Sequence, residues 1–284
     1  MSQNFQVVNK SKALGSILPP YNRGMALKVS PPKRPAKVAK AAPPPPSRKP
    51  VKAATAPKPA DKTSLSAESK AKSSAPSSRV SAITAGLESL DKVSAADHKE
   101  WGGQVTDPQG KPIKPGKTET DEGRVEKVGE YWKDVGMSGW DGKTDQPWSS
   151  AYISSLHKRA GITNFNGSIR HGSYIDQAIK DRKGGNDKAP YWGYKPSERA
   201  PEKGDLVCWT RKGSTASFDD QRGGKYTSHC DRVQSVNEGT ITTLGGNVGD
   251  SVSTRQFKID GKGKLDDPAK RFIAVLAPKH FETK

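Results

Sequence analysis

Three side chains far apart in the sequence, Ser149, His229 and Asn247, are of the types that carry out nucleophilic acyl transfer. A serine in the first turn of a helix lies where unpaired backbone N–H groups stabilise a developing negative charge. A histidine can accept the hydroxyl proton and return it to the leaving group, while a side-chain amide orients the imidazole. These residues predict a Ser149 nucleophile, a His229 base and an Asn247 that orients the imidazole, with Asp250 as the substitute for Asn247.

Other polar and aromatic residues are candidates for supporting roles. His171 and Gln146 are possible accessory residues, and His171 could equally form a structural hydrogen bond to a loop carbonyl. His157 is expected to be a solvated helix residue. Aromatic side chains expected in loops could hold a glycan or a peptide, because a large ring offers contact area at little entropic cost. They are Trp140, Tyr191, Trp192 and Tyr194.

The elements that must position these residues follow from hydrophobic periodicity. Helical spacing predicts helices over residues 124–136, 147–160 and 173–181, the second of which has Ser149 in its first turn. After Pro201, short β-branched and aromatic runs predict strands at 206–210, 229–236, 240–244 and 272–276. Helices followed by strands indicate an α+β domain with N-terminal helices packed on an antiparallel sheet.

Four motifs in order resemble the CHAP and NlpC types of papain-like peptidoglycan amidase. They are Trp148-Ser149, Gly204-Asp205-Leu206, Ser228-His229-Cys230 and Gly245-Gly246-Asn247. In those proteins a Trp-Cys pair opens the catalytic helix, so Ser149 stands in the position of the cysteine. A branch with Trp-Ser and a His-x-x-Tyr-Ile segment is more similar still, and residues 171–175 match that segment. The resemblance covers residues 121 to about 278 and implies a papain-like fold that hydrolyses amide or peptide bonds of the cell wall.

The replacement of a thiol by a hydroxyl leaves other functions open. A hydroxyl keeps its proton until a base removes it during attack, whereas a thiol ionises near neutral pH when assisted. The same fold could therefore bind wall fragments without cleaving them. Ser149 by itself could simply cap a helix. A third alternative is a nucleic-acid-associated structural protein that acts through its N-terminal segment.

The two cysteines exclude a disulfide scaffold and a four-thiolate zinc site. On a strand, neighbouring side chains point to opposite faces, so Cys230 should face away from the side occupied by His229. Cys208 is expected to be a small core residue. A disulfide between them is not expected, because it would need partner strands that bring the two Cα atoms within about 7 Å. No metal-ligand spacing and no cofactor motif is present.

Composition divides the chain. Residues 1–60 contain twelve Lys or Arg, twelve Pro and no Asp or Glu, so they carry +12 of the net charge of +18. Such a segment cannot bury enough apolar surface to offset the entropy of ordering it. We predict a disordered basic arm over residues 1–100, a linker over 101–120 and the papain-like domain over 121–284. The arm is suited to non-specific binding of polyanions such as nucleic acid or anionic wall polymers.

No export signal and no membrane-spanning segment is evident in the sequence. A wall-directed protein without an export signal must reach its substrate by another route. Together with the basic arm, this favours a phage-encoded or virion-associated protein, or one held in the host cytoplasm before delivery to the wall. Peptidoglycan is the predicted partner.

Overall fold

The computed structural model describes residues 78–211 and 213–284. The helices are α1 (Ser78–Glu100), α2 (Arg124–Asp134), α3 (Ser149–Arg159) and α4 (His171–Lys183). The strands are β1 (Gln104–Thr106), β2 (Pro112–Lys114), β3 (Tyr191–Tyr194), β4 (Leu206–Thr210), β5 (Ser228–Asn237), β6 (Thr240–Gly245), β7 (Ser253–Lys258) and β8 (Phe272–Pro278). The predicted α+β class is confirmed, and Ser149 lies in the first turn of its helix as predicted, although α3 begins at Ser149 and not at Pro147.

The eight strands of the described residues join one sheet in the order β2-β1-β7-β6-β5-β4-β8-β3. Every neighbouring pair is antiparallel except β1 and β7, which run parallel. The sheet is therefore mixed, which corrects the prediction of a purely antiparallel one. Neither strand of the parallel pair was predicted, because β1 lies ahead of α2 and β7 lies between two of the predicted strands.

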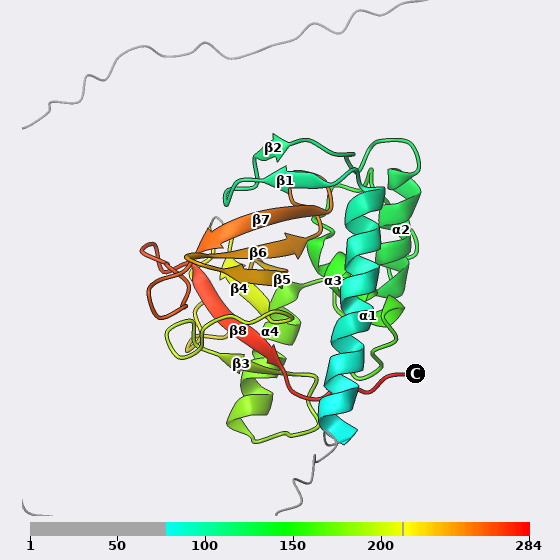
Figure 1. Cartoon of the computed structure of the whole chain (residues 1–284). Helices are drawn as coiled ribbons and strands as arrows, with labels where there is room; N and C mark the ends of the chain where they lie inside the picture. Colours follow the sequence, from blue (N-terminus) through cyan, green and yellow to red (C-terminus); the bar gives the residue numbers. More distant parts are fainter. Residues whose placement is uncertain (1–77, 212) are drawn as a thin grey trace, which may run out of the picture. The chain divides into compact units, whose positions relative to one another are not determined.

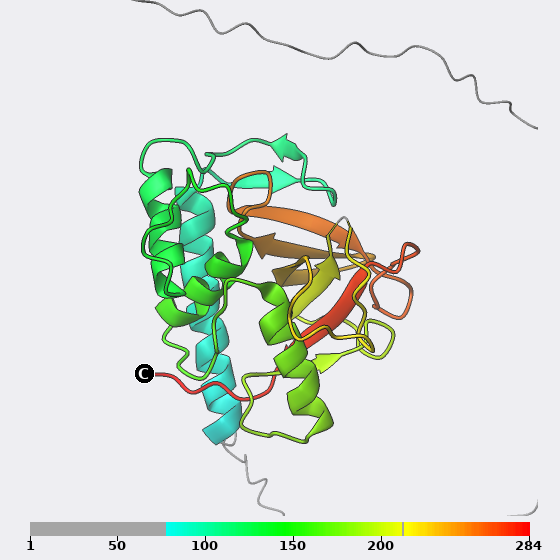
Figure 2. The ribbon, with the colours of Figure 1, turned by 180° about the vertical axis from the view of Figure 1, so that it is seen from behind.

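The helices gather against one face of the sheet (Figure 1). α3 contacts β5 and β6, and α4 contacts β3, β5 and β8, while α1 and α2 both pack on α3. Seen from behind, α4 lies across the sheet (Figure 2). The larger hydrophobic core fills this interface, and it includes Trp148, Tyr152 and Leu206. Burial of these side chains fixes the start of α3 against the strands.

A smaller hydrophobic cluster lies on the opposite face of the sheet, where Val207, Trp209 and Phe257 are among its members. Strand alternation explains the division, because Val207 and Trp209 are two apart and Cys208 between them joins the larger core. His229 pairs with Trp209 in the β4–β5 register, so it lies on the face of the smaller cluster.

Residues 78–120 are part of the fold. α1 buries Leu90, and Trp101 just after it is also fully buried. Asp91 of α1 forms an ion pair of 2.7 Å with Arg232, a completely buried residue of β5. The prediction of a disordered arm and a linker is therefore wrong for residues 78–120, whose order depends on contacts distant in the sequence. The rest of the predicted arm, residues 1–77, and its binding of polyanions lie outside the described residues.

Cys208 and Cys230 form a disulfide, which corrects the expectation that they are unbridged. The β4–β5 register places them directly opposite each other, with a Cα–Cα distance of 4.2 Å. This separation meets the condition that the sequence could not establish. No helix in the described part of the chain is long and apolar enough to cross a bilayer.

Candidate functional site

Ser149 is the first residue of α3, and Trp148 precedes it as the capping residue. The Trp148 indole stacks on Trp101 with ring centroids 5.2 Å apart, and it donates a hydrogen bond to Glu119. No side chain caps the start of the helix. The N–H groups of the first turn thus have no intrahelical acceptor and can stabilise negative charge beside the Ser149 hydroxyl.

The histidine that contacts Ser149 is His171. Ser149 Oγ lies 2.7 Å from His171 Nε2, and both residues are buried. His171 is the first residue of α4, so the starts of two helices meet at this hydrogen bond. The structure therefore corrects the predicted pairing of Ser149 with His229, and it moves His171 from an accessory position to the centre of the site.

The second ring nitrogen of His171, Nδ1, is hydrogen-bonded to the hydroxyl of Tyr174, one turn along α4. Burial, aided by nearby His229 and Arg211, holds the pKa of His171 well below its ordinary value. A neutral imidazole that accepts the Ser149 proton at Nε2 must donate from Nδ1, and the Tyr174 oxygen is the acceptor. Burial raises the pKa of Tyr174 well above its usual value, so the phenol remains neutral.

His229 lies next to this pair, but its hydrogen bonds point to other groups. Its ring centroid is 5.2 Å from that of His171. Its Nε2 is 2.8 Å from Asp231 Oδ1, and its Nδ1 is 3.0 Å from Arg211 Nη2. A guanidinium only donates, so Nδ1 accepts from Arg211, and a neutral ring then carries its proton on Nε2 and donates it to Asp231. Arg255 Nη2 also lies 3.1 Å from Nε2, and in this tautomer its N–H donates to Asp231 instead. Asp231, and not Asn247, is therefore the residue that orients His229.

A buried ion pair completes this network. Arg255 Nε lies 2.7 Å from Asp231 Oδ2, and the Thr243 hydroxyl donates to the same oxygen over 3.0 Å. Burial by itself would raise the pKa of Asp231, but Arg255 and His229 outweigh it and hold the pKa below its ordinary value. Burial lowers the pKa of His229 to about 4, against the opposing charge of Asp231. His229 is consequently neutral at pH 7.

Ser149 and His171 line a cavity of about 590 Å³, here called the serine cavity. Trp140, a candidate substrate-binding residue, and Gln146, a candidate accessory residue, also line it. Ser228, at the start of β5, lines the same cavity and is 7 % exposed, and its hydroxyl has no hydrogen-bond partner among residues 78–211 and 213–284. A buried hydroxyl without a partner at a cavity wall is a donor that a bound molecule could use.

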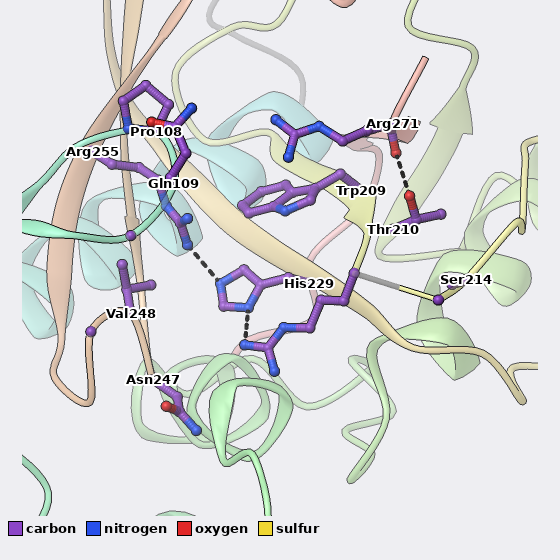
Figure 3. A pocket seen from close by; sticks show the side chains of 14 residues that line it. Pro108, Gln109, Trp209, Thr210, Ser214, His229, Asn247, Val248, Arg255 and Arg271 are labelled. Carbon is purple, nitrogen blue, oxygen red and sulfur yellow. Dashed lines mark hydrogen bonds between the residues drawn. The ribbon is translucent and has the colours of Figure 1, made fainter. Parts of the chain in front are cut away.

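A second cavity of about 560 Å³, here called the arginine cavity, adjoins the first, because Arg211, Gly213 and Ser214 line both. Figure 3 shows Arg255, Trp209 and His229 at its walls and the Asn247 amide away from the His229 ring. Asn247 has a left-handed backbone with φ 53°, and within the described residues its side chain forms no hydrogen bond.

Both cavities are strongly cationic. Arg170, Arg211, Arg222 and Lys225 line the serine cavity, and Arg255 and Arg271 add to Arg211 in the arginine cavity. No Asp or Glu of residues 78–211 or 213–284 lines either cavity. A cleft with one sign of charge concentrates ligands of the opposite sign. The geometry therefore combines a hydroxyl–imidazole pair with a surrounding surface that attracts anions.

Residues 121–276, more than half of the chain, match the family described as "Uncharacterized protein conserved in bacteria (DUF2272)". The chain belongs to the DUF2272 family. No curated protein and no solved structure matches it. The family match includes the Ser149–His171 pair and the His229 network, whereas α1, β1 and β2 precede it.

Two glycine-containing motifs of this DUF2272 chain have packing roles. A Cβ on Gly246 would lie 2.5 Å from the Tyr152 side chain, and one on Gly245 would lie 1.8 Å from Asp231 Oδ1. Glycine is required at both positions because neighbouring side chains occupy that space. Asp205, directly before β4, is paired with Arg199 over 3.2 Å, and burial raises its pKa to about 6. Both motifs therefore contribute to packing around the strands, and neither contacts Ser149.

The predicted substrate aromatics other than Trp140 line neither the serine cavity nor the arginine cavity. Tyr191, Trp192 and Tyr194 are in β3 and not in a loop. Tyr191 is buried, and its hydroxyl is 2.8 Å from Nε2 of His157, which is fully buried and not solvated as predicted. Asp250, the substitute orienting residue, is exposed on a loop, and its backbone oxygen accepts from Glu119.

Several residues of the site were not predicted from the sequence, and Asp231, Tyr174 and Arg255 are examples. Asp231 could have been found, since the spacing His229-x-Asp231 on a strand places both side chains on one face. Tyr174 could also have been found, since it lies three residues after His171 on one helix, within the His-x-x-Tyr-Ile segment. Arg255 had no local signal, because its contacts depend on how β7 pairs in the sheet. Within the described residues, no group of three His, Cys, Asp or Glu side chains could hold a metal ion.

Proposed function

We propose that this protein hydrolyses amide or peptide bonds, with Ser149 as the nucleophile and His171 as the general base. The observation that carries the proposal is the 2.7 Å hydrogen bond between Ser149 Oγ and His171 Nε2 at the wall of the serine cavity. His171 takes the hydroxyl proton as Ser149 attacks the carbonyl carbon, and it gives this proton to the departing amine, which leaves the acyl group as an ester on Ser149. A water molecule, with His171 as its base, then attacks the ester carbonyl, so the carboxylic acid is released and Ser149 Oγ regains its proton.

Groups close to Ser149 and His171 can stabilise the charges that develop during the reaction. The N–H groups of the first turn of α3, together with the unpartnered Ser228 hydroxyl, are available to the carbonyl oxygen as it becomes negative. Tyr174 holds His171 in the tautomer that accepts at Nε2. Asp231 favours protonation of His171 electrostatically. The general base His171 thus belongs to helix α4, and His229 with its hydrogen-bonded carboxylate, Asp231, lies next to it.

The substrate class rests on two supports. The motif order resembles that of papain-like CHAP and NlpC amidases, which act on cell-wall peptides, and the helix of the nucleophile precedes β4 and β5 along the chain, as in those proteins. The cationic lining of the serine cavity suits a substrate that carries negative charge. Peptidoglycan peptides, which contain free carboxylates, meet both requirements.

The test is the release of new amino groups from purified peptidoglycan by wild-type protein, Ser149→Ala and His171→Gln. Loss of the nucleophile or the base should lower the rate by about 10²-fold or more. Ser154→Ala is the matched control. Ser154 is buried in the same helix, but its hydroxyl bonds only to the backbone of Ser150 and Ser168.

Equal release by wild type and Ser149→Ala would refute the mechanism. A protein that co-sediments with peptidoglycan but releases no amine would instead be a wall-binding relative without catalytic activity. Ser149 is only 2 % exposed, so a substrate in the cavity has little direct access to its hydroxyl. This low exposure is compatible with binding to the wall without cleavage.

A further inference from the structure

Neither Ser149 nor His171 lines the arginine cavity, and its lining is distinguished by arginine side chains. Arg211, Arg255 and Arg271 come from three separate segments of the chain and meet at one cavity of about 560 Å³. Figure 3 shows Arg271 and Arg255 approaching Trp209 from different sides, with His229 below the indole. Such convergence of cations requires a counter-charge, because like charges at short range destabilise a protein.

The protein supplies only part of that counter-charge. Asp231 neutralises Arg255, to which it is bonded over 2.7 Å. Arg211 donates to the neutral His229 ring, and burial and the charge of Arg255 lower the pKa of Arg211. Within the described residues, Arg211 and Arg271 form no ion pair with a carboxylate. Two positive charges in this cavity are therefore available to an anion.

The walls of the cavity are held in place before any ligand arrives. Arg255 is only 6 % exposed, and its guanidinium carbon lies 4.8 Å from the centre of the Trp209 ring. Trp209 in turn packs edge-on against Phe257 at 5.2 Å and against Phe272 at 5.7 Å. Ordered guanidinium groups bind planar oxyanions well, since less entropy is lost for each hydrogen bond that forms.

We propose that the arginine cavity binds a carboxylate group, with Arg211 and Arg271 as the residues that contact it. A carboxylate matches the planar fork of a guanidinium. Because Arg211 also lines the serine cavity, a peptide cleaved at Ser149 can extend a carboxylate into this second cavity. This extension rests on the proposed function, whereas binding of a carboxylate by the cavity does not.

The experiment measures binding by calorimetry to full-length Ser149→Ala protein, which cannot cleave the probe. The probes are two capped dipeptides, alanyl-glutamate and alanyl-glutamine, which differ only in one carboxylate. We expect the carboxylate probe to bind roughly tenfold more tightly, and this preference to fall with added salt. The Arg271→Gln substitution should abolish the preference, and Arg271 is exposed enough for the fold to tolerate the change.

Lys270→Gln is the matched control, because it removes an equal charge from the adjacent exposed residue, which lines neither cavity. Equal binding of the two probes, or an unchanged preference in Arg271→Gln, would overturn the proposal. Tighter binding of inorganic phosphate than of the carboxylate probe would also overturn it. None of these results depends on hydrolysis, so failure of the carboxylate site and failure of the serine mechanism are distinguished.

Discussion

Replacing Asp231 by Asn should destabilise the protein far more than replacing an exposed acid. The Asp231 carboxylate is fully buried and accepts from His229 over 2.8 Å, from Thr243 over 3.0 Å and from Arg255 over 2.7 Å. Asparagine has nearly the same shape, but it has no charge and places an N–H₂ group against these donors. The Arg255 guanidinium would then be a buried cation without a counter-ion.

Loss of one partner from a buried ion pair costs about 3–5 kcal/mol of unfolding free energy. Urea unfolding at pH 7, followed by circular dichroism, measures this loss for Asp231→Asn. Asp220→Asn is the control, because its ion pair with Arg222 is exposed and should contribute less than about 1 kcal/mol. The double variant Asp231→Asn/Arg255→Met also removes the buried cation that has lost its counter-ion. It should therefore recover about half of the lost unfolding free energy.

A loss of less than about 1 kcal/mol in Asp231→Asn would refute this reasoning, since it would mean that the carboxylate is not what holds Arg255. A double variant no more stable than the single one would refute it as well. In either case, the positions of His229 and Arg255 at the wall of the arginine cavity would have to depend on contacts other than those with Asp231.

Two further predictions concern stability. Because the pKa of His229 is about 4 in the folded protein, below the ordinary 6.5, the unfolded chain binds more protons between these values, and stability should fall as pH drops from 6.5 towards 4. The loss from His229 is about 3 kcal/mol by pH 4, and an unchanged urea midpoint between pH 7 and pH 4 would contradict it. The Cys208–Cys230 disulfide, with a sequence separation of 22, should contribute about 3 kcal/mol. Reductant should therefore lower the urea midpoint of wild type but not that of Cys208→Ser/Cys230→Ser, and equal midpoints with and without reductant would disprove the contribution.

The sequence determined the features that depend on neighbouring residues. Hydrophobic periodicity gave α2, α3 and the strands β4, β5, β6 and β8 to within a few residues, because helix and strand patterns are local. It also placed Ser149 at the start of a helix, from Pro147 and the apolar positions that follow. The change from helices to strands indicated an α+β domain for the same reason.

Tertiary structure alone decided the residues that meet. Ser149 and His171 are each the first residue of a helix, and only the packing of α3 and α4 on the sheet brings their side chains within 2.7 Å. Likewise, the β4–β5 register joins Cys208 to Cys230, and the docking of α1 through Asp91 and Arg232 orders a segment of weak local pattern. Hydrogen bonds and ion pairs act over a few ångströms in space, whereas a sequence records only distance along the chain.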